Sequence, residues 1–160
     1  MMPERPFAKD KLFLGTAVRP DQLLQPGPLL SKIRHCDLLV PEYHGQWSAV
    51  EWRKGNPWFG NYDTIVEFAS IHQQRVRGHS LIWEQMTPDW ARADMMRDAD
   101  WSTVEQHFAN LLSRYSGSIS EWIVVNEMID TEDGDRDFRR TSFQRAYGNS
   151  YVERALHTAN

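Results

Sequence analysis

Short apolar runs alternate with longer amphipathic runs along this chain, and this alternation limits the possible folds more than any other feature. It is typical of strands and helices that take turns around a parallel sheet. Four strand–helix pairs can be assigned. The predicted strands are 12–18, 38–40, 75–79 and 122–125. The predicted helices begin after Gly27, near Asn61, at Ser102 and near Ser142.

Some of these boundaries carry recognisable signals. Ser102-Thr103-Val104-Glu105 fits a capping box, and Gly117 is a typical residue at a helix end. Residues 122–125 are apolar on both faces, as a buried parallel strand should be. The last helix is predicted over 142–159. The acidic stretch 130–137 is interpreted as a solvated loop.

Composition argues against several classes of protein. The 160 residues are 41% hydrophobic and 25% charged, which suits one domain with one core. No stretch approaches the roughly eighteen apolar residues of a membrane span, so no membrane association is expected. The net charge of −4 repels polyphosphate and argues against a nucleic-acid partner. The single cysteine, Cys36, and the histidines show no metal-ligand spacing, so neither a metal nor an organic cofactor is expected.

The chain as given shows no apolar segment of a secretion signal near its first residue. We therefore expect a cytoplasmic location, or secretion if a leader has been removed. Residues 1–10 are predicted to form an N-terminal arm and residues 11–160 one domain. Seven Trp, five Tyr and seven Phe exceed the needs of a small core, so some of the rings are expected in a ligand groove.

Polar side chains follow three of the predicted strands at the point where each strand ends. Glu42 follows the second strand, His79 and Trp83 follow the third, and Asn126 and Glu127 follow the fourth. In parallel α/β folds the reactive residues gather at the carboxyl edge of the sheet. One mouth could therefore receive all five residues.

These segments resemble the endo-1,4-β-xylanases of glycoside hydrolase family 10, and the similarity extends from Leu12 to the last helix. The strongest match is the strand that ends in Asn-Glu. The resemblance implies an α/β fold of the (β/α)₈ TIM-barrel type, here truncated to about the first four β/α units. The matching segments are Phe13–Ala17, Glu42–Trp47, Arg77–Trp83 with Pro88 and Trp90, Trp122–Glu127, and Arg140, Ser142, Phe143, Gly148 and Tyr151.

The resemblance also implies a role for each residue at the mouth. Glu127 would be the acid/base of a retaining glycosidase, and Asn126 would bind the 2-hydroxyl of the sugar at the cleavage point. His79 and Trp83 would contact the same sugar. Glu42 would bind hydroxyls of the next sugar, one position further from the cleavage point.

Gln46 and Trp47 are also expected to bind substrate by this resemblance, although the family pattern is not fully kept around them. Gln46 replaces a Lys, Tyr43 replaces an Asn and Glu84 replaces a His. These replacements affect the wall that would bind the sugar. No cofactor is implied, and the expected ligand is β-1,4-xylan or a xylo-oligosaccharide.

The length of the chain bears on the catalytic machinery. Complete (β/α)₈ barrels typically need about 250 residues, and the family's nucleophilic Glu lies on the seventh strand. No residue of this sequence matches that nucleophile. We therefore expect the chain to carry only the acid/base half of the site. We also expect it either to self-associate or to pair with a complementary C-terminal half. A non-catalytic sugar-binding or structural half-barrel is the alternative.

Two further groups of residues are given structural interpretations. Four arginines are interleaved with acidic residues, which favours a solvated face or an ion-pair network over an anion site. Three tryptophans are as compatible with packing as with binding. The arginines are Arg136, Arg139, Arg140 and Arg145, and the tryptophans are Trp52, Trp58 and Trp101.

Overall fold

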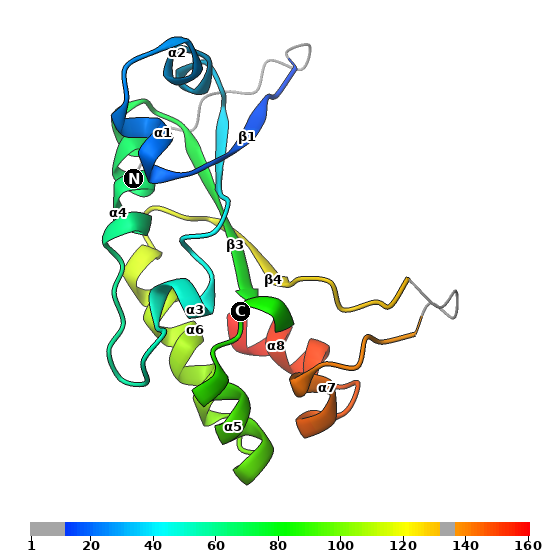
Figure 1. Ribbon diagram of the computed structural model, residues 1–160. Helices are drawn as coiled ribbons and strands as arrows, with labels where there is room; N and C mark the ends of the chain where they lie inside the picture. Colours follow the sequence, from blue (N-terminus) through cyan, green and yellow to red (C-terminus); the bar gives the residue numbers. More distant parts are fainter. Residues whose placement is uncertain (1–11, 132–136) are drawn as a thin grey trace.

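The computed structural model describes residues 12–131 and 137–160, and it contains a four-stranded parallel sheet (Figure 1). The strand order β1-β2-β3-β4 follows the chain, as the alternating pattern predicts. Neighbouring strands are parallel at each of the three pairings. The predicted arm, 1–10, lies outside the described residues. The strands are β1 (Gly15–Val18), β2 (Leu38–Pro41), β3 (Arg75–Ile82) and β4 (Glu121–Val125).

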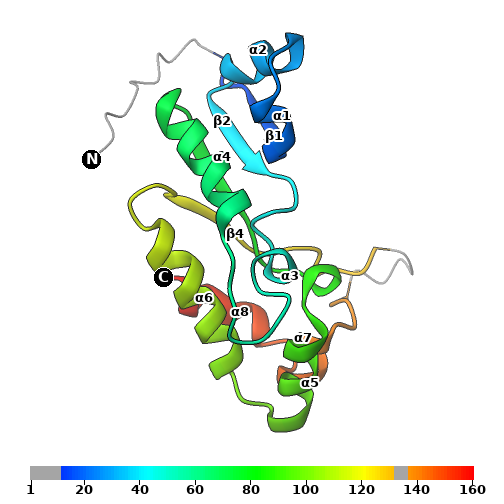
Figure 2. The same ribbon diagram turned by 60° about the vertical axis from the view of Figure 1, so that its left-hand side comes forward.

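Helices connect the strands, and Figures 1 and 2 show α4, α6 and α8 along one side of the sheet. Short helices occupy the loops beside them. None of the helices in the described ranges is long and apolar enough to span a membrane. The helices are α1 (Pro20–Leu24), α2 (Pro28–Arg34), α3 (Trp47–Val50), α4 (Gly60–Ile71), the 3₁₀ helix η1 (Glu84–Met86), α5 (Asp89–Asp98), α6 (Ser102–Tyr115), α7 (Ser142–Tyr147) and α8 (Tyr151–Ala159).

The core lies between the sheet and these helices. Apolar side chains of α4 and α6 recur every three or four residues, which places them on the face that the sheet buries. Ile65 of α4 and Leu111 of α6 are buried in the same cluster as Leu39 of β2. Both helices therefore bury the side on which their apolar residues recur.

Several element boundaries differ from the predictions. The predicted helix over 142–159 is two helices, because the chain turns at Gly148 with a φ of +70° that favours glycine. The capping box at Ser102 is wrong: the carboxylate of Asp100 accepts from the Ser102 backbone N–H at 3.2 Å. The third strand extends to Ile82, three residues further than predicted, and the helices α1, α3 and α5 had not been predicted.

The opposite face of the sheet carries charged side chains. Gly78 faces Trp122 on the helix side, so Arg77 and His79 point to the other face by the alternation of a strand. There Arg77 forms a 3.1 Å ion pair with Glu121, and both side chains keep contact with solvent. Parallel sheets are normally covered on both faces, whereas charged side chains on this face contact solvent.

Replacing Gly78 by alanine is expected to destabilise the fold by about 1–3 kcal/mol, because overpacking forces neighbouring groups to move. A Cβ at this position would lie 2.0 Å from a ring carbon of Trp122. Chemical denaturation followed by circular dichroism measures the effect. Gly117→Ala is the matched control, since a Cβ there meets nothing within 4 Å. Equal stability of the two variants would contradict the proposed close packing of Gly78 on Trp122.

Candidate active site

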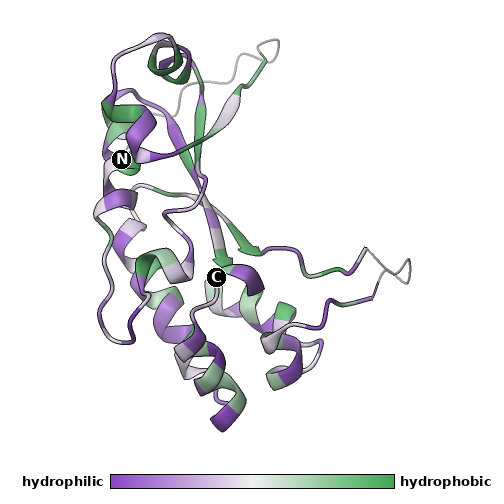
Figure 3. Cartoon of the chain, in the orientation of Figure 1, coloured by the Kyte–Doolittle hydropathy of each residue, from purple (hydrophilic) through white to green (hydrophobic). Residues whose placement is uncertain are grey.

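The neighbouring strands β3 and β4 bring together four of the predicted site residues, which are His79, Trp83, Asn126 and Glu127. The backbone N–H of Asn126 donates to the Ile82 carbonyl at 2.9 Å, which joins the two strand ends. His79 lies in β3 opposite Ile123 of β4 in the strand register, and Trp83 follows directly after β3. Figure 3 shows the hydrophobic β4 giving way to hydrophilic residues where it ends.

Glu127 has an unusual backbone and two side-chain partners. Its φ of +52° lies in the left-handed region, which costs a non-glycine residue on the order of 1–3 kcal/mol. Its Oε2 accepts from Arg139 Nη1 at 3.2 Å and from Gln85 Nε2 at 3.4 Å. The side chain is 40% exposed and that of Arg139 is 27% exposed. The carboxylate is thus accessible and held on one side.

The sequence did not identify Arg139 as a site residue. The prediction of an ion-pair network suits Arg139, whose partner among the described residues is Glu127. Arg140 and Arg145 are exposed, whereas Arg136 and residues 132–135 of the acidic stretch lie outside the described residues. No local motif identifies Arg139, because a long-range contact places it.

The His79 imidazole is half-buried beside Glu127. Burial lowers the pKa of His79, and the negative charge of Glu127 raises it by a smaller amount. Its Nδ1 is buried and has no hydrogen-bond partner among the residues described. The ring opposite Ile123 is therefore a neutral group at pH 7, with unsatisfied hydrogen-bonding capacity at the site.

Trp83 is half-buried at the same edge of the sheet. Its Nε1 is buried and lacks a hydrogen-bond partner within the described ranges. The Thr87 hydroxyl donates to the Trp83 carbonyl at 2.9 Å and fixes the backbone after β3. Trp83 and His79 thus each have a buried ring nitrogen that no described residue hydrogen-bonds.

Gln46 and Trp47 lie deeper than expected for residues that bind substrate. Each is 1% exposed. Gln46 donates to the Glu42 carbonyl at 3.3 Å, and the Trp47 ring stacks on His107 with centroids 4.2 Å apart. Side chains with so little exposed surface support a site from beneath. Direct contact with sugar by these two residues therefore remains a prediction, and their burial argues against it.

Glu42 is exposed after β2 and belongs to a different set of contacts. Its Oε2 lies 3.2 Å from Arg19 Nη1, and Arg19 also pairs with Asp21 at 3.3 Å. The neighbouring Tyr43 is exposed as well. Among the described residues, the ion pair of Glu42 is with Arg19, so this part of the mouth is organised independently of Glu127.

Glu84 explains one of the departures from the family pattern. Its carboxylate accepts from the backbone N–H of Ser142 at 2.9 Å and from the Ser142 hydroxyl at 2.6 Å. Arg92 Nε lies 3.4 Å from its other oxygen. Glu84 therefore binds the first residue of α7 instead of lining the sugar wall.

The three tryptophans whose sequence context fits packing and binding equally well fall into two groups. Trp101 is buried and donates to the Thr158 hydroxyl at 2.9 Å. Trp52 and Trp58 are both more than half exposed. Trp101 is therefore a packing residue, whereas Trp52 and Trp58, between α3 and α4, are surface rings.

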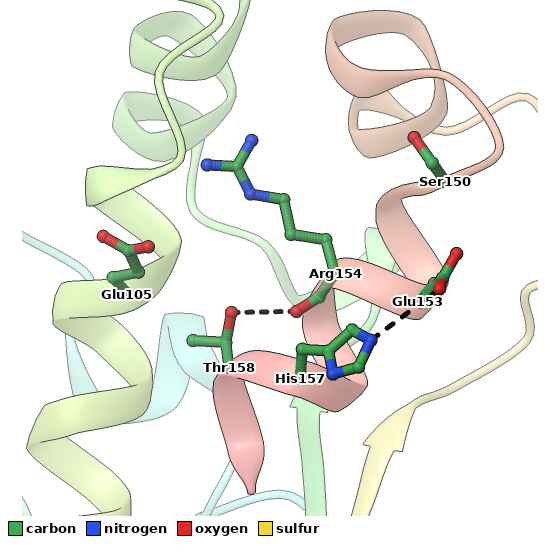
Figure 4. Close-up of a pocket in the computed structure, with 6 residues that line it drawn as sticks. All are labelled: Glu105, Ser150, Glu153, Arg154, His157 and Thr158. Carbon is green, nitrogen blue, oxygen red and sulfur yellow. Dashed lines mark hydrogen bonds and ion pairs between the residues drawn. The ribbon is translucent and has the colours of Figure 1, made fainter.

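Figure 4 shows a hollow between α6 and α8, and its lining includes Thr158, the hydrogen-bond partner of Trp101. It contains charges of both signs, and His157 lies 3.7 Å from Glu153 across one turn of α8. In the described part of the chain, no group of three or more His, Cys, Asp or Glu side chains could hold a metal ion. Its lining residues are Glu105, Ser150, Glu153, Arg154, His157 and Thr158.

Comparison with known proteins gives consistent matches. The sequence model of glycosyl hydrolase family 10 matches residues 5–160. Endo-1,4-beta-xylanase 2 of Claviceps purpurea is 31% identical over 150 residues, which cover 94% of this chain and 45% of that protein. The crystal structure of xylanase XynB from Paenibacillus barcinonensis is 30% identical with a TM-score of 0.79, covering 91% of this chain and 44% of its own.

A further solved structure is a variant in complex with xylotriose. It is 25% identical to this chain, has a TM-score of 0.81, and the match covers 92% of this chain and 46% of its own. The chain thus spans less than half the length of each of these three proteins. The fold is that of the first four β/α units of their TIM barrel, as predicted.

Proposed function

Because the chain belongs to glycosyl hydrolase family 10, we propose that it is the acid/base part of a retaining endo-1,4-β-xylanase. The observation that carries this proposal is the position of Asn126 and Glu127 where β4 ends, next to His79. An accessible carboxylate beside an amide and a neutral imidazole suits protonation of a glycosidic oxygen. The proposed substrate is β-1,4-xylan or a xylo-oligosaccharide.

Each side chain has a defined part in the proposed reaction. Glu127 protonates the leaving oxygen and then activates water for the second step. Asn126 binds the 2-hydroxyl of the reacting sugar, a contact that strengthens in the transition state. By the family resemblance, His79 and Trp83 contact the same sugar. Glu42 binds hydroxyls of the next sugar, one position further from the cleavage point.

The proposed mechanism also needs a nucleophile. A retaining glycosidase requires a second carboxylate about 5–5.5 Å from the acid/base. No residue of this sequence matches the family's nucleophile motif, so we propose that turnover requires a complementary C-terminal half. The alternative is a non-catalytic sugar-binding or structural half-barrel that needs a partner chain.

The proposal predicts sugar binding that depends on His79. His79→Ala is expected to weaken xylotriose binding roughly 5–10-fold, because one hydrogen bond to the sugar contributes about 1 kcal/mol. Isothermal titration calorimetry with xylotriose measures it. His157→Ala removes an exposed imidazole on α8 and serves as the control. If neither the wild-type chain nor the His157 variant binds xylotriose or longer xylo-oligosaccharides, the proposed function is wrong.

A further inference from the structure

We propose that Arg139 positions the Glu127 carboxylate, and that Glu84 holds Arg139 in place through the first residue of α7. The catalytic meaning of this inference rests on the proposed role of Glu127, whereas the contacts themselves are features of the free protein. Arg139 is a positioning residue in this proposal, because its guanidinium contacts the carboxylate and not the sugar.

Backbone pairing places Arg139 beside Glu127. The segment that leaves β4 pairs with residues 137–139, through an antiparallel bridge between Ile129 and Phe138. The Arg139 backbone N–H donates to the Met128 carbonyl at 2.8 Å. Arg139 therefore lies across from the residue that follows Glu127, and its side chain needs only a short reach to the carboxylate.

The other side of Arg139 is held by α7. The Thr141 backbone N–H donates to the Arg139 carbonyl at 2.9 Å, and the Thr141 hydroxyl accepts from Gln144 at 3.0 Å. One residue further, Ser142 gives both its N–H and its hydroxyl to Glu84. Glu84 is itself anchored by Arg92 of α5. The segment from Arg139 to Ser142 is thus fixed at both ends.

The same short segment also brings Gln85 to the carboxylate. Glu84 and Gln85 are adjacent in η1; Glu84 contacts α7 while Gln85 contacts Glu127 Oε2. Both donors of Glu127 act on Oε2, and no residue of the described ranges has a hydrogen bond to Oε1. The arrangement leaves Oε1 as the oxygen available to a glycosidic oxygen.

Side-chain support matters at this position because the Glu127 backbone is strained. A residue with a positive φ persists when its surroundings determine its conformation, and such residues often occur at functional sites. An exposed ion pair adds only about 0–1 kcal/mol to stability. Arg139 is therefore expected to affect the site more than the free energy of unfolding, and the two effects can be measured separately.

The experiment compares Arg139→Gln with Arg145→Gln. The second substitution removes the same charge from an exposed position in the last turn of α7. NMR titration of the His79 ring in the free protein reports the local charge, because the Glu127 carboxylate acts on the pKa of His79. In Arg139→Gln that carboxylate is no longer balanced, so the pKa of His79 should rise. Arg139→Lys keeps the charge and should restore a value near the wild type.

Glu84→Gln tests the second half of the proposal. It weakens the bonds to Ser142 without touching Glu127, and should move the pKa of His79 in the same direction as Arg139→Gln. Both variants should also bind xylotriose roughly 3–10-fold more weakly, as expected for the loss of one oriented polar contact. Their unfolding midpoints should stay close to that of Arg145→Gln.

Two results would overturn the inference: a His79 pKa unchanged in Arg139→Gln, or an equal rise in Arg145→Gln. An effect of Arg139→Gln without any effect of Glu84→Gln would overturn the role of Glu84. The titration needs no sugar, so its outcome is independent of the proposed function. If the pKa rises as expected while no variant binds xylotriose, the positioning role stands and the xylanase proposal fails.

Discussion

Replacing Trp47 by alanine is expected to lower the free energy of unfolding by about 3–5 kcal/mol, a large part of the stability of a domain this size. The 1% exposed ring of α3 joins three other helices. It stacks on His107 of α6 at 4.2 Å and meets Trp90 of α5 edge-on at 5.9 Å, and Phe143 of α7 lies 6.4 Å away.

His107, on which the Trp47 ring stacks, is itself buried in the core. His107 donates from Nε2 to the Leu81 carbonyl at 2.8 Å, and complete burial lowers the pKa of His107 to about 3. A neutral imidazole therefore stacks on Trp47 at ordinary pH. Truncating Trp47 would leave this polar ring beside a cavity, and surrounding elements relax only partly around such cavities.

Denaturant unfolding of Trp47→Ala measures the loss, with Trp52→Ala as the control. Trp52 is 59% exposed, and its main contact is with the Arg53 guanidinium, 4.1 Å from the ring centroid. Its removal should cost less than about 1 kcal/mol. A Trp47 variant that keeps wild-type stability but loses xylotriose binding would show that the ring contacts sugar, contrary to its burial.

Local patterns in the sequence predicted the strands and the main helices, because burial of one or both faces of an element fixes the spacing of its apolar residues. The order of the four parallel strands follows the order of these alternating elements along the chain. The helix α5 was missed because only Ala91 and Met95 of its ten residues are buried, so its apolar stripe is too short. The break at Gly148 was missed because a helical pattern continues on both sides of it.

The candidate site was predicted in part for a related reason. The motif residue His79 lies within β3, opposite Ile123, and Glu127 lies just after β4, so the pairing of these two neighbouring strands brings them together. Arg139 was not found, since its position depends on the pairing of Ile129 with Phe138 across a loop. The contact between Glu84 and Ser142 joins residues 58 positions apart and carries no local signal.

Glu127→Gln is expected to reduce xylan hydrolysis about 10²–10⁴-fold when the chain is combined with the C-terminal half of a xylanase relative. The isolated chain should release little reducing sugar, because it offers no carboxylate that matches the family's nucleophile. Adding a second chain that supplies the later strands should raise the rate. The glutamine side chain nearly matches the glutamate in shape and can still accept from Arg139, but it cannot deliver the proton.

The leaving group separates acid catalysis from a general loss of structure. The nitrophenolate of an aryl xylobioside leaves without being protonated. The rate of the first step on this substrate should therefore fall much less in Glu127→Gln than the rate of xylan hydrolysis does. Glu105→Gln on α6, at the hollow in Figure 4, is the matched control and should keep full activity on both substrates. Equal losses on xylan and on the aryl substrate would argue that Glu127 is not the acid. Ordinary turnover by the isolated wild-type chain, abolished by Glu127→Gln, would instead mean that this half-barrel or its self-assembled form supplies its own nucleophile.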